Sequence, residues 1–329
     1  MKLIYRLKSK MWFVLLIFVL MMVPMFSAYA NDFPSSTIEF MVPWPAGGGS
    51  DILCRSVSDF LERELGVSVI VVNKPGGGGG VGLVYLKNAR NDGYTIGMSS
   101  NALIHTAYCS TIKTPVEDYE ALVHMTSCPA ALTVRADSPW QTLEDFIADA
   151  KSKPGILRNA NDTPGGASHI AAKLLEEATG IELNKVPYAG FAPSVSALAG
   201  GHVDSTTVDI TEVIALHEAG EFRILGVMDT NRHFLVPNVP TMIEQGYDFI
   251  SSDSNIVLTP KGVQEERLKI LENAFLEVLN NQELVDLLQN YGFNVDPHGR
   301  AWTKEYLQEL DEKLYKVFYD LGMVIHPKQ

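Results

Sequence analysis

Three short apolar strands in the first hundred residues each lead into a loop of small residues and then into a helical pattern. The predicted strands are Ile38–Val42, Val67–Val72 and Tyr94–Met98. Strands that alternate with helices indicate a parallel sheet, in which the loops after successive strands meet at one edge. Glycine lets backbone N–H groups approach a ligand, and helix N-termini favour negative charge. The pattern therefore predicts a cleft that receives an anion mainly through the backbone.

The loops after these strands supply the first candidate site residues. Ser50 is suited to cap the helix that follows the first loop, and five consecutive glycines follow Pro75 in the second loop. Asp51 would repel an anion, so its expected role is to stabilise the helix N-terminus or to orient the loop. The candidates from the three loops are Ala46, Gly47, Gly48, Gly49, Ser50, Asp51, Gly76, Gly77, Ser99 and Asn101.

A second series of strands and helices spans residues 132–228, and the last eighty residues are mostly helical. Ile256–Leu258 is a predicted strand that returns to the first series. Two α/β lobes joined by two crossing strands, with loops that face one cleft, form the architecture of a hinged binding protein. The expected division is a leader at 1–30, a first lobe at 31–133 plus 250–329, and a second lobe at 134–249.

The first thirty residues have the pattern of a secretory signal peptide. Basic residues precede an almost wholly apolar run at Met11–Met22, and the small-x-small sequence Ala28-Tyr29-Ala30 ends the segment. The alternative is an anchor helix, but the run is short for a membrane span of about 20 residues. We therefore predict export to the periplasm with cleavage after Ala30.

The charge of the chain limits its partners. The net charge of −13 becomes −17 when the four basic residues of the leader are removed. Such an acidic chain is not expected to bind nucleic acid or anionic membrane surfaces. Overall charge would not attract an anionic ligand either, so local dipoles would have to capture it.

Three cysteines are an odd number for an exported protein, and one disulfide plus one buried thiol is the simplest arrangement. Cys54 lies on an apolar helix face, which leaves Cys109 and Cys128 as a possible pair. Three separate thiols are the alternative. The eight histidines include no pair at metal-ligand spacing, and we expect neither a metal nor a cofactor.

Two motif-like features have simpler explanations than catalysis. Gly77, Gly79 and Gly82 satisfy the dinucleotide pattern G-x-G-x-x-G, but no acidic residue stands about 20 positions further on. Ser168 and His169 are adjacent on a predicted helix start and point in different directions, so they cannot form a nucleophile–base pair. We expect Ser168 to cap the helix and to present its hydroxyl and N–H groups to the ligand.

The loops together resemble a known family. The sequence Val-Pro-Trp-Pro-Ala-Gly-Gly-Gly-Ser-Asp at 42–51, Asn73–Gly76 and the Asp-Gly-Tyr-Thr sequence at 92–95 resemble extracytoplasmic solute receptors of the tripartite tricarboxylate transporter family, the Bug proteins. Further matches follow in the same order, and the resemblance covers residues 36–325. These further matches are His169, Val186-Pro187-Tyr188, the Gly-Gly-His-Val-Asp sequence at 200–204, and Val239-Pro240-Thr241 followed by Glu244.

This resemblance implies a periplasmic-binding-protein-like fold with a Venus-flytrap cleft, and a receptor that delivers a small carboxylate-bearing metabolite to membrane permease subunits. We expect the receptor to be a monomer. In the family, backbone amides and ordered waters of two loops hold one carboxylate of the ligand. Tyr188 is a further candidate, which either contacts the ligand or forms part of the wall of the cleft. Asp209 stands one place away from an aspartate that many members have. In this chain, the second of these two carboxylate-binding loops corresponds to the candidate ligand-binding residues Thr163, Gly165, Gly166, Ala167 and Ser168.

Two classes of function stay open on the sequence. The first is a non-enzymatic solute receptor for a transporter, or, as a variant, a ligand sensor for a signalling partner. The second is an exported α/β enzyme that uses Ser50 or Ser168. The sequence contains no evident base-plus-nucleophile or metal constellation, so we favour the receptor.

Overall fold

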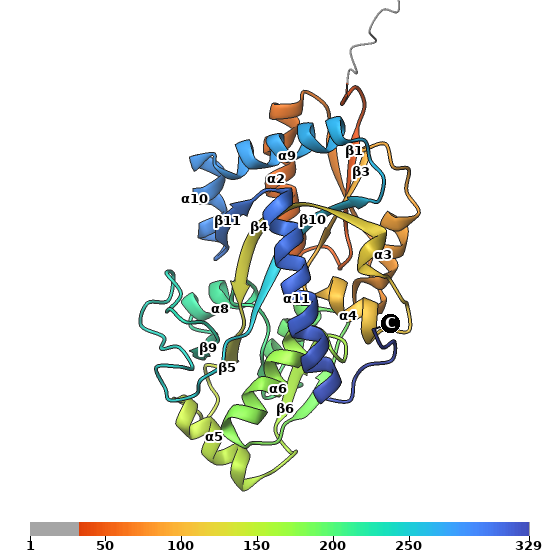
Figure 1. Ribbon diagram of the computed structural model, residues 1–329. Coiled ribbons are helices and arrows are strands. Elements are labelled where there is room, and N and C mark those ends of the chain that lie inside the picture. Colours follow the sequence, from red (N-terminus) through yellow and green to blue (C-terminus); the bar gives the residue numbers. More distant parts are fainter. Residues whose placement is uncertain (1–32, 329) are drawn as a thin grey trace, which may run out of the picture. The chain divides into compact units, whose positions relative to one another are not determined.

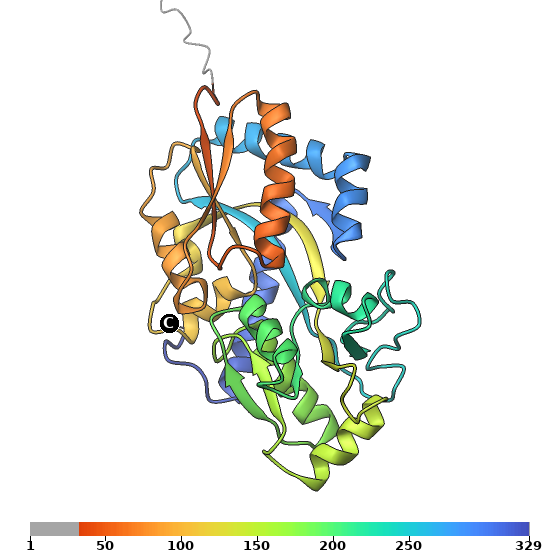
Figure 2. The ribbon, with the colours of Figure 1, turned by 180° about the vertical axis from the view of Figure 1, so that it is seen from behind.

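The computed structural model describes residues 33–328, and the residues from Ser36 onward form one compact unit. Within this unit, helices cover two β-sheets (Figures 1 and 2). Within residues 33–328, no helix has both the length and the apolar character needed to cross a membrane. The predicted leader at 1–30 and its cleavage site lie outside the described residues.

The first sheet has six strands in the order β11-β4-β10-β3-β1-β2. Strand β1 (Ile38–Val42) pairs in parallel with β2 (Val69–Asn73) and β3 (Thr95–Ser99), which confirms the predicted parallel arrangement. The other three strands pair antiparallel, and the predicted strand at 256–258 is the centre of β10. They are β4 (Tyr119–Pro129), β10 (Ser252–Pro260) and β11 (Asn294–His298).

Helix α2 (Gly49–Leu65) packs against β2 with a buried face that includes Leu53, Val57 and Leu61. It ends at Gly66, whose φ of 69° is the left-handed conformation typical of a helix C-terminus. Its N-cap is Gly48 rather than the predicted Ser50, which lies in the first turn. The other helices of this part are α3 (Gly80–Lys87), α4 (Ala102–Tyr108), α9 (Glu265–Leu279), α10 (Gln282–Asn290) and α11 (Arg300–Asp320).

The second sheet has five strands in the order β7-β6-β8-β5-β9. Strand β8 (Ser205–Thr206) is only two residues long, and the residues after it form a loop that carries Asp209. Strand β6 (Arg158–Asn161) pairs in parallel with β7 and β8. The remaining elements are β5 (Ala131–Arg135), β7 (Asn184–Pro187), β9 (Phe222–Val227), α5 (Leu143–Ser152), α6 (Ala167–Thr179), α7 (Phe191–Ala199) and α8 (Ile214–Glu218).

Two crossing segments join the sheets side by side. Strand β4 continues through Ala130 into β5, and the chain returns from the second sheet at Ser251 into β10. The N–H of Ala130 donates to the carbonyl of Ser251 at 2.8 Å, and the N–H of Met228 donates to the carbonyl of Ala130 at 2.9 Å. Two α/β sheets connected by two crossing strands agree with the predicted periplasmic-binding-protein-like fold. Both sheets are mixed, however, rather than parallel-rich as expected.

The predicted disulfide between Cys109 and Cys128 is wrong, because all three cysteines are free thiols. Cys128 is fully buried in β4, where its sulfur accepts a hydrogen bond from the side-chain amide of Asn255 at 3.7 Å. Cys109 ends helix α4 and packs in a different apolar cluster. Burial raises the pKa of Cys109 to about 12, so its thiol is protonated at neutral pH. Cys54 is buried in the core, as predicted.

Candidate ligand-binding pocket

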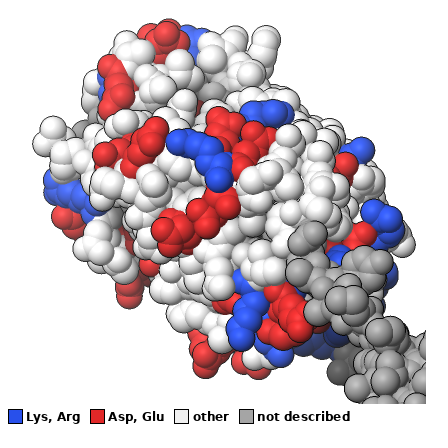
Figure 3. Space-filling model, turned by 90° about the horizontal axis from the view of Figure 1, so that it is seen from above, with Lys and Arg blue, Asp and Glu red and all other residues white. Residues whose placement is uncertain are grey.

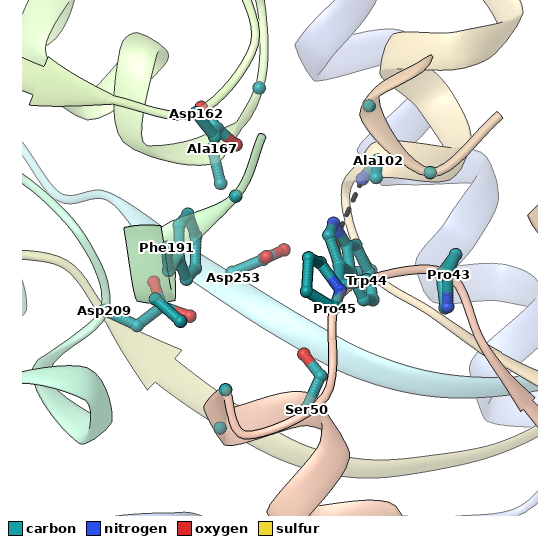
Figure 4. Close-up of a pocket in the computed structure, with 18 of the residues that line it drawn as sticks. Pro43, Trp44, Pro45, Ser50, Ala102, Asp162, Ala167, Phe191, Asp209 and Asp253 are labelled. Carbon is teal, nitrogen blue, oxygen red and sulfur yellow. Dashed lines mark hydrogen bonds between the residues drawn. The ribbon is translucent and has the colours of Figure 1, made fainter. Parts of the chain in front are cut away.

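A cavity of about 140 Å³ lies between loops from both sheets. The loops after β1, β2 and β3 line it on one side, and the loops after β6, β7 and β8 line it on the other (Figure 4). A cavity of about 150 Å³ can hold a molecule of benzene's size, so this one suits a small solute. Nine predicted site residues line it, namely Gly48, Gly49, Ser50, Gly76, Gly77, Thr163, Gly166, Ala167 and Asp209.

The other eight predicted residues do not line the cavity. Tyr188 packs at the edge of an apolar cluster of the second sheet instead. The side-chain amide of Asn101 donates to the carbonyl of Ser252 at 3.0 Å. The complete set is Ala46, Gly47, Asp51, Ser99, Asn101, Gly165, Ser168 and Tyr188.

Asp51 organises the first loop, as predicted. Its Oδ2 accepts hydrogen bonds from the N–H of Gly47 at 3.1 Å and from Nε of Arg55 at 2.9 Å. Its Oδ1 accepts from the side-chain amide of Asn73 at 2.9 Å. Burial alone would raise the pKa of Asp51, but these hydrogen bonds outweigh burial and lower it. The loop between β1 and α2 is therefore held by an ionised carboxylate.

A second carboxylate occupies the N-terminus of α2. Oε1 of Glu212 accepts a hydrogen bond from the N–H of Gly49 at 2.7 Å, across 163 residues of sequence. Glu212 ends the short 3₁₀ helix η3 (Ile210–Glu212) on the second-sheet side. The predicted anion site at this helix N-terminus is therefore already taken, in part, by the protein's own side chain.

A carboxylate of the protein, that of Asp162, likewise accepts hydrogen bonds at the N-terminus of α6. Oδ1 of Asp162 accepts from Oγ of Ser168 at 3.0 Å and from the N–H of His169 at 3.3 Å. The N-cap of α6 is Gly166 rather than the predicted Ser168, whose buried hydroxyl faces Asp162. A Cβ at Gly166 would collide with the Asp162 carboxylate, so a larger residue at this position would require the carboxylate to move.

Several backbone donors beside the cavity stay free. The N–H groups of Gly48, Ser50, Gly77 and Gly78 have no hydrogen-bond partner among the described residues. The φ angles at 76–79 are 132°, 59°, 64° and 96°, a left-handed run that explains why glycines follow one another here. Successive amides in such a turn form a concave anion site. The amides of Gly48, Ser50 and Gly77 are the remaining part of the predicted backbone cradle, and Gly78 adds an amide that was not predicted.

The charged side chains that line the cavity are all acidic. Asp162, Asp209, Glu212 and Asp253 line it, and no lysine, arginine or histidine of the described chain does. Figure 4 shows the carboxyl groups of Asp162, Asp209 and Asp253 around one space, with Trp44 and Pro45 on the facing side. The outer surface differs, because acidic and basic side chains are interspersed on the face in Figure 3.

Burial changes the acidity of all four carboxyl groups. It raises the pKa of Asp162 and Glu212 to about 7 and that of Asp253 to about 6. Burial and the neighbouring carboxylates raise the pKa of Asp209 well above its usual value. Protons therefore compensate part of this negative charge near neutral pH.

Sequence reasoning found Asp209 but missed the other three acids. Asp162 had a usable signal, because it directly follows β6 and precedes the second loop. Glu212 and Asp253 belong to no recognisable motif. Trp44 also lines the cavity. The other lining residues that were not predicted are Pro43, Pro45, Gly78, Gly79, Ser100, Ala102, Ala189, Gly190, Phe191, Ala192, Thr211, Asn255 and Phe293.

Residues 53–322 match the family model of the tripartite tricarboxylate transporter family receptor. The chain belongs to this receptor family. It is 30% identical to Protein BugT of Bordetella pertussis over 268 residues, which is 80% of this chain and 82% of BugT. The family is one of solute-binding receptors with the fold of periplasmic binding proteins, so this member is a solute receptor.

Two solved structures show the likeness in three dimensions. The periplasmic binding protein BugD superimposes with a TM-score of 0.84 at 24% identity, over 89% of this chain and 99% of BugD, which establishes the shared fold. R. palustris Rpa4515 with adipate has a TM-score of 0.84 at 25% identity, over 89% of this chain and 99% of that chain. The second of these structures contains a small dicarboxylate.

Proposed function

We propose that this receptor captures a small carboxylate-bearing metabolite in the cavity and delivers it to the permease subunits of a tripartite tricarboxylate-type transporter. The single observation that carries the proposal is the cavity itself, which loops of both sheets enclose in a member of this receptor family. The family likeness to Rpa4515 with adipate supports a carboxylate as the ligand.

The free amides of Gly48, Ser50, Gly77 and Gly78 are the groups we assign to the ligand's carboxylate. A micromolar Kd corresponds to about −8 kcal/mol. Hydrogen bonds to a charged group contribute roughly 1.5–3 kcal/mol each, so four amides reach this range before the costs of ordering the ligand are counted. Side-chain charge is not needed for this end of the ligand.

Export, assembly and division into lobes complete the proposal. The receptor functions in the periplasm as a monomer after cleavage behind Ala30, as the leader sequence indicates. The first lobe comprises 31–133 plus 250–329 and the second comprises 134–249. Helices α2 and α6 each point an N-terminus at the cavity from a different lobe, so the ligand would hold the lobes together.

Calorimetry against mono-, di- and tricarboxylates, amino acids and aromatic acids tests the proposal. A carboxylate should bind with a Kd in the micromolar range or below and should be recovered unchanged. Binding of uncharged sugars alone would contradict the proposal, and turnover of the bound compound would favour the exported enzyme instead.

A pair of variants tests the assignment to the backbone. Gly48→Val places a branched side chain beside the cavity and should weaken binding by at least tenfold. Lys74→Ala is the matched control, because Nζ of Lys74 lies 4.5 Å from the ring centre of Tyr85 and the residue does not line the cavity. If Lys74→Ala abolishes binding and Gly48→Val does not, the backbone assignment is wrong.

A further inference from the structure

Asp209 is a buried carboxylate whose side chain has no hydrogen-bond partner among residues 33–328. Its side chain is 8% exposed and lines the cavity, and no donor among the described residues reaches its oxygens. Asp253, which is 6% exposed, accepts hydrogen bonds at Oδ1 from the N–H groups of Asn101 (2.9 Å) and Ser254 (3.0 Å). Asp209 is thus the one cavity carboxylate whose hydrogen-bonding capacity is wholly left for a ligand.

The surroundings of Asp209 make its lack of a partner unfavourable. A buried carboxylate needs a proton, a cation or several donors. Asp162, Glu212 and Asp253 bring three more acids to the same cavity, and they repel a charge on Asp209. No basic side chain of the described residues lines the cavity to neutralise them. A positively charged group of a solute would take the place of the protons that otherwise neutralise these carboxyl groups.

The geometry favours an organic cation over a metal ion. Among the described residues, no group of three or more His, Cys, Asp or Glu side chains is placed to hold a metal. The aromatic side chains of Trp44 and Phe191 line the same cavity. Aromatic faces attract ammonium groups through their negative electrostatic potential. Acids combined with aromatic rings form a site of the kind that binds a protonated amine.

We propose that the solute carries a protonated amine in addition to its carboxylate, and that Asp209 binds this amine, with Asp162, Glu212 and Asp253 around it. This inference rests on the proposed function, because the same solute places its carboxylate on the free amides of the glycine-rich loops. The amine is recognised on the acidic side of the cavity. The solute class is therefore a small zwitterion rather than a di- or tricarboxylate.

Calorimetry with matched probes tests the inference. The amino-acid probes are the linear compounds with a terminal amine, from glycine to 6-aminohexanoate, together with alanine and aspartate. The comparison compounds are the monocarboxylates and dicarboxylates of the same chain lengths and the diamine 1,4-diaminobutane. At least one amino acid should bind a hundredfold more tightly than the monocarboxylate and the dicarboxylate of its own length. A dicarboxylate that binds as tightly as its amino acid would overturn the inference and leave the proposed function standing.

The remaining outcomes separate the two proposals. Binding of 1,4-diaminobutane but of no carboxylate would contradict the proposed function and support the amine site. No binding by any probe would overturn both. The assignment to Asp209 is tested by Asp209→Asn, which should weaken binding of the amino acid at least tenfold and leave monocarboxylate binding within twofold.

Asp248→Asn, at an exposed aspartate, is the matched control and should bind the amino acid as the wild type does. Asparagine has the shape of aspartate, and the side chain of Asp209 makes no hydrogen bond with the described part of the chain that the variant would lose. The melting temperature of Asp209→Asn should therefore not fall, which shows that the variant is folded. A folded Asp209→Asn protein with unchanged affinity for the amino acid would overturn the assignment.

Discussion

Replacing Glu212 with glutamine should make the ligand-free protein more stable at neutral and alkaline pH. Glutamine keeps an oxygen that can accept the hydrogen bond from the N–H of Gly49, now 2.7 Å from Oε1 of Glu212. It removes the negative charge beside Asp209. The substitution therefore isolates the cost of ionising a desolvated carboxylate in the cavity.

The sign of the effect follows from the raised pKa. Below about pH 4.5, Glu212 is protonated in the folded and unfolded states, and the charge makes no difference to stability. Between pH 4.5 and 7, the unfolded chain loses the proton while the folded protein keeps it, because burial raises the folded pKa to about 7. The wild type therefore loses stability relative to Glu212→Gln as pH rises through this window.

The size of the effect follows from the same shift. One pKa unit corresponds to about 1.4 kcal/mol, so the full shift corresponds to about 3 kcal/mol at pH 8. The side chain is partly exposed to the cavity, and water there screens its charge. We expect a relative gain of about 1–3 kcal/mol for Glu212→Gln, which is a rise in melting temperature of roughly 2–8 °C for a protein of this size.

Thermal and urea unfolding of ligand-free protein between pH 4 and 8.5 measures this gain. The curves for wild type and Glu212→Gln should converge below pH 4.5 and separate above pH 6. Glu218→Gln, at an exposed glutamate of α8, is the control and should differ from wild type by less than about 0.5 kcal/mol throughout. A pH-independent difference, or a Gln variant that is less stable at pH 8, would refute the desolvation argument.

Two further predictions concern the whole chain. Saturating ligand should lower the radius of gyration in small-angle scattering, because the ligand bridges loops of both lobes; an unchanged profile with confirmed binding would indicate a rigid or already closed cleft. The exported protein, unfolded without reductant, should take up three alkylating groups, since Cys54, Cys109 and Cys128 are free. A mass spectrum with one modified cysteine would show a disulfide instead.

The sequence by itself determined the local elements of this protein. Gly66 and Gly180 end α2 and α6 in the left-handed conformation, with φ angles of 69° and 70°, and Thr142 forms a capping box at the start of α5. These signals act over a few residues, so they do not depend on the rest of the fold. The parallel order of the first three strands followed from the same short-range alternation.

Strands that depend on distant partners were harder to predict. Strand β4 contains His124, Thr126 and Ser127 within a long crossing segment, so its apolar alternation is weak. It is stabilised by pairing with β10 and β11, which lie more than 120 residues further along the chain. The wrong pairing of Cys109 and Cys128 has the same origin, since residue counting carries no information on distance.

The acidic cavity is what only the tertiary structure decided. Asp162, Asp209 and Glu212 come from loops of the second sheet, and Asp253 comes from the crossing strand β10. In the sequence, each is one acidic residue among 39. Their chemical behaviour changes when the fold brings them together, because burial and mutual repulsion make the ionised carboxylates unfavourable unless a proton or a cation neutralises them.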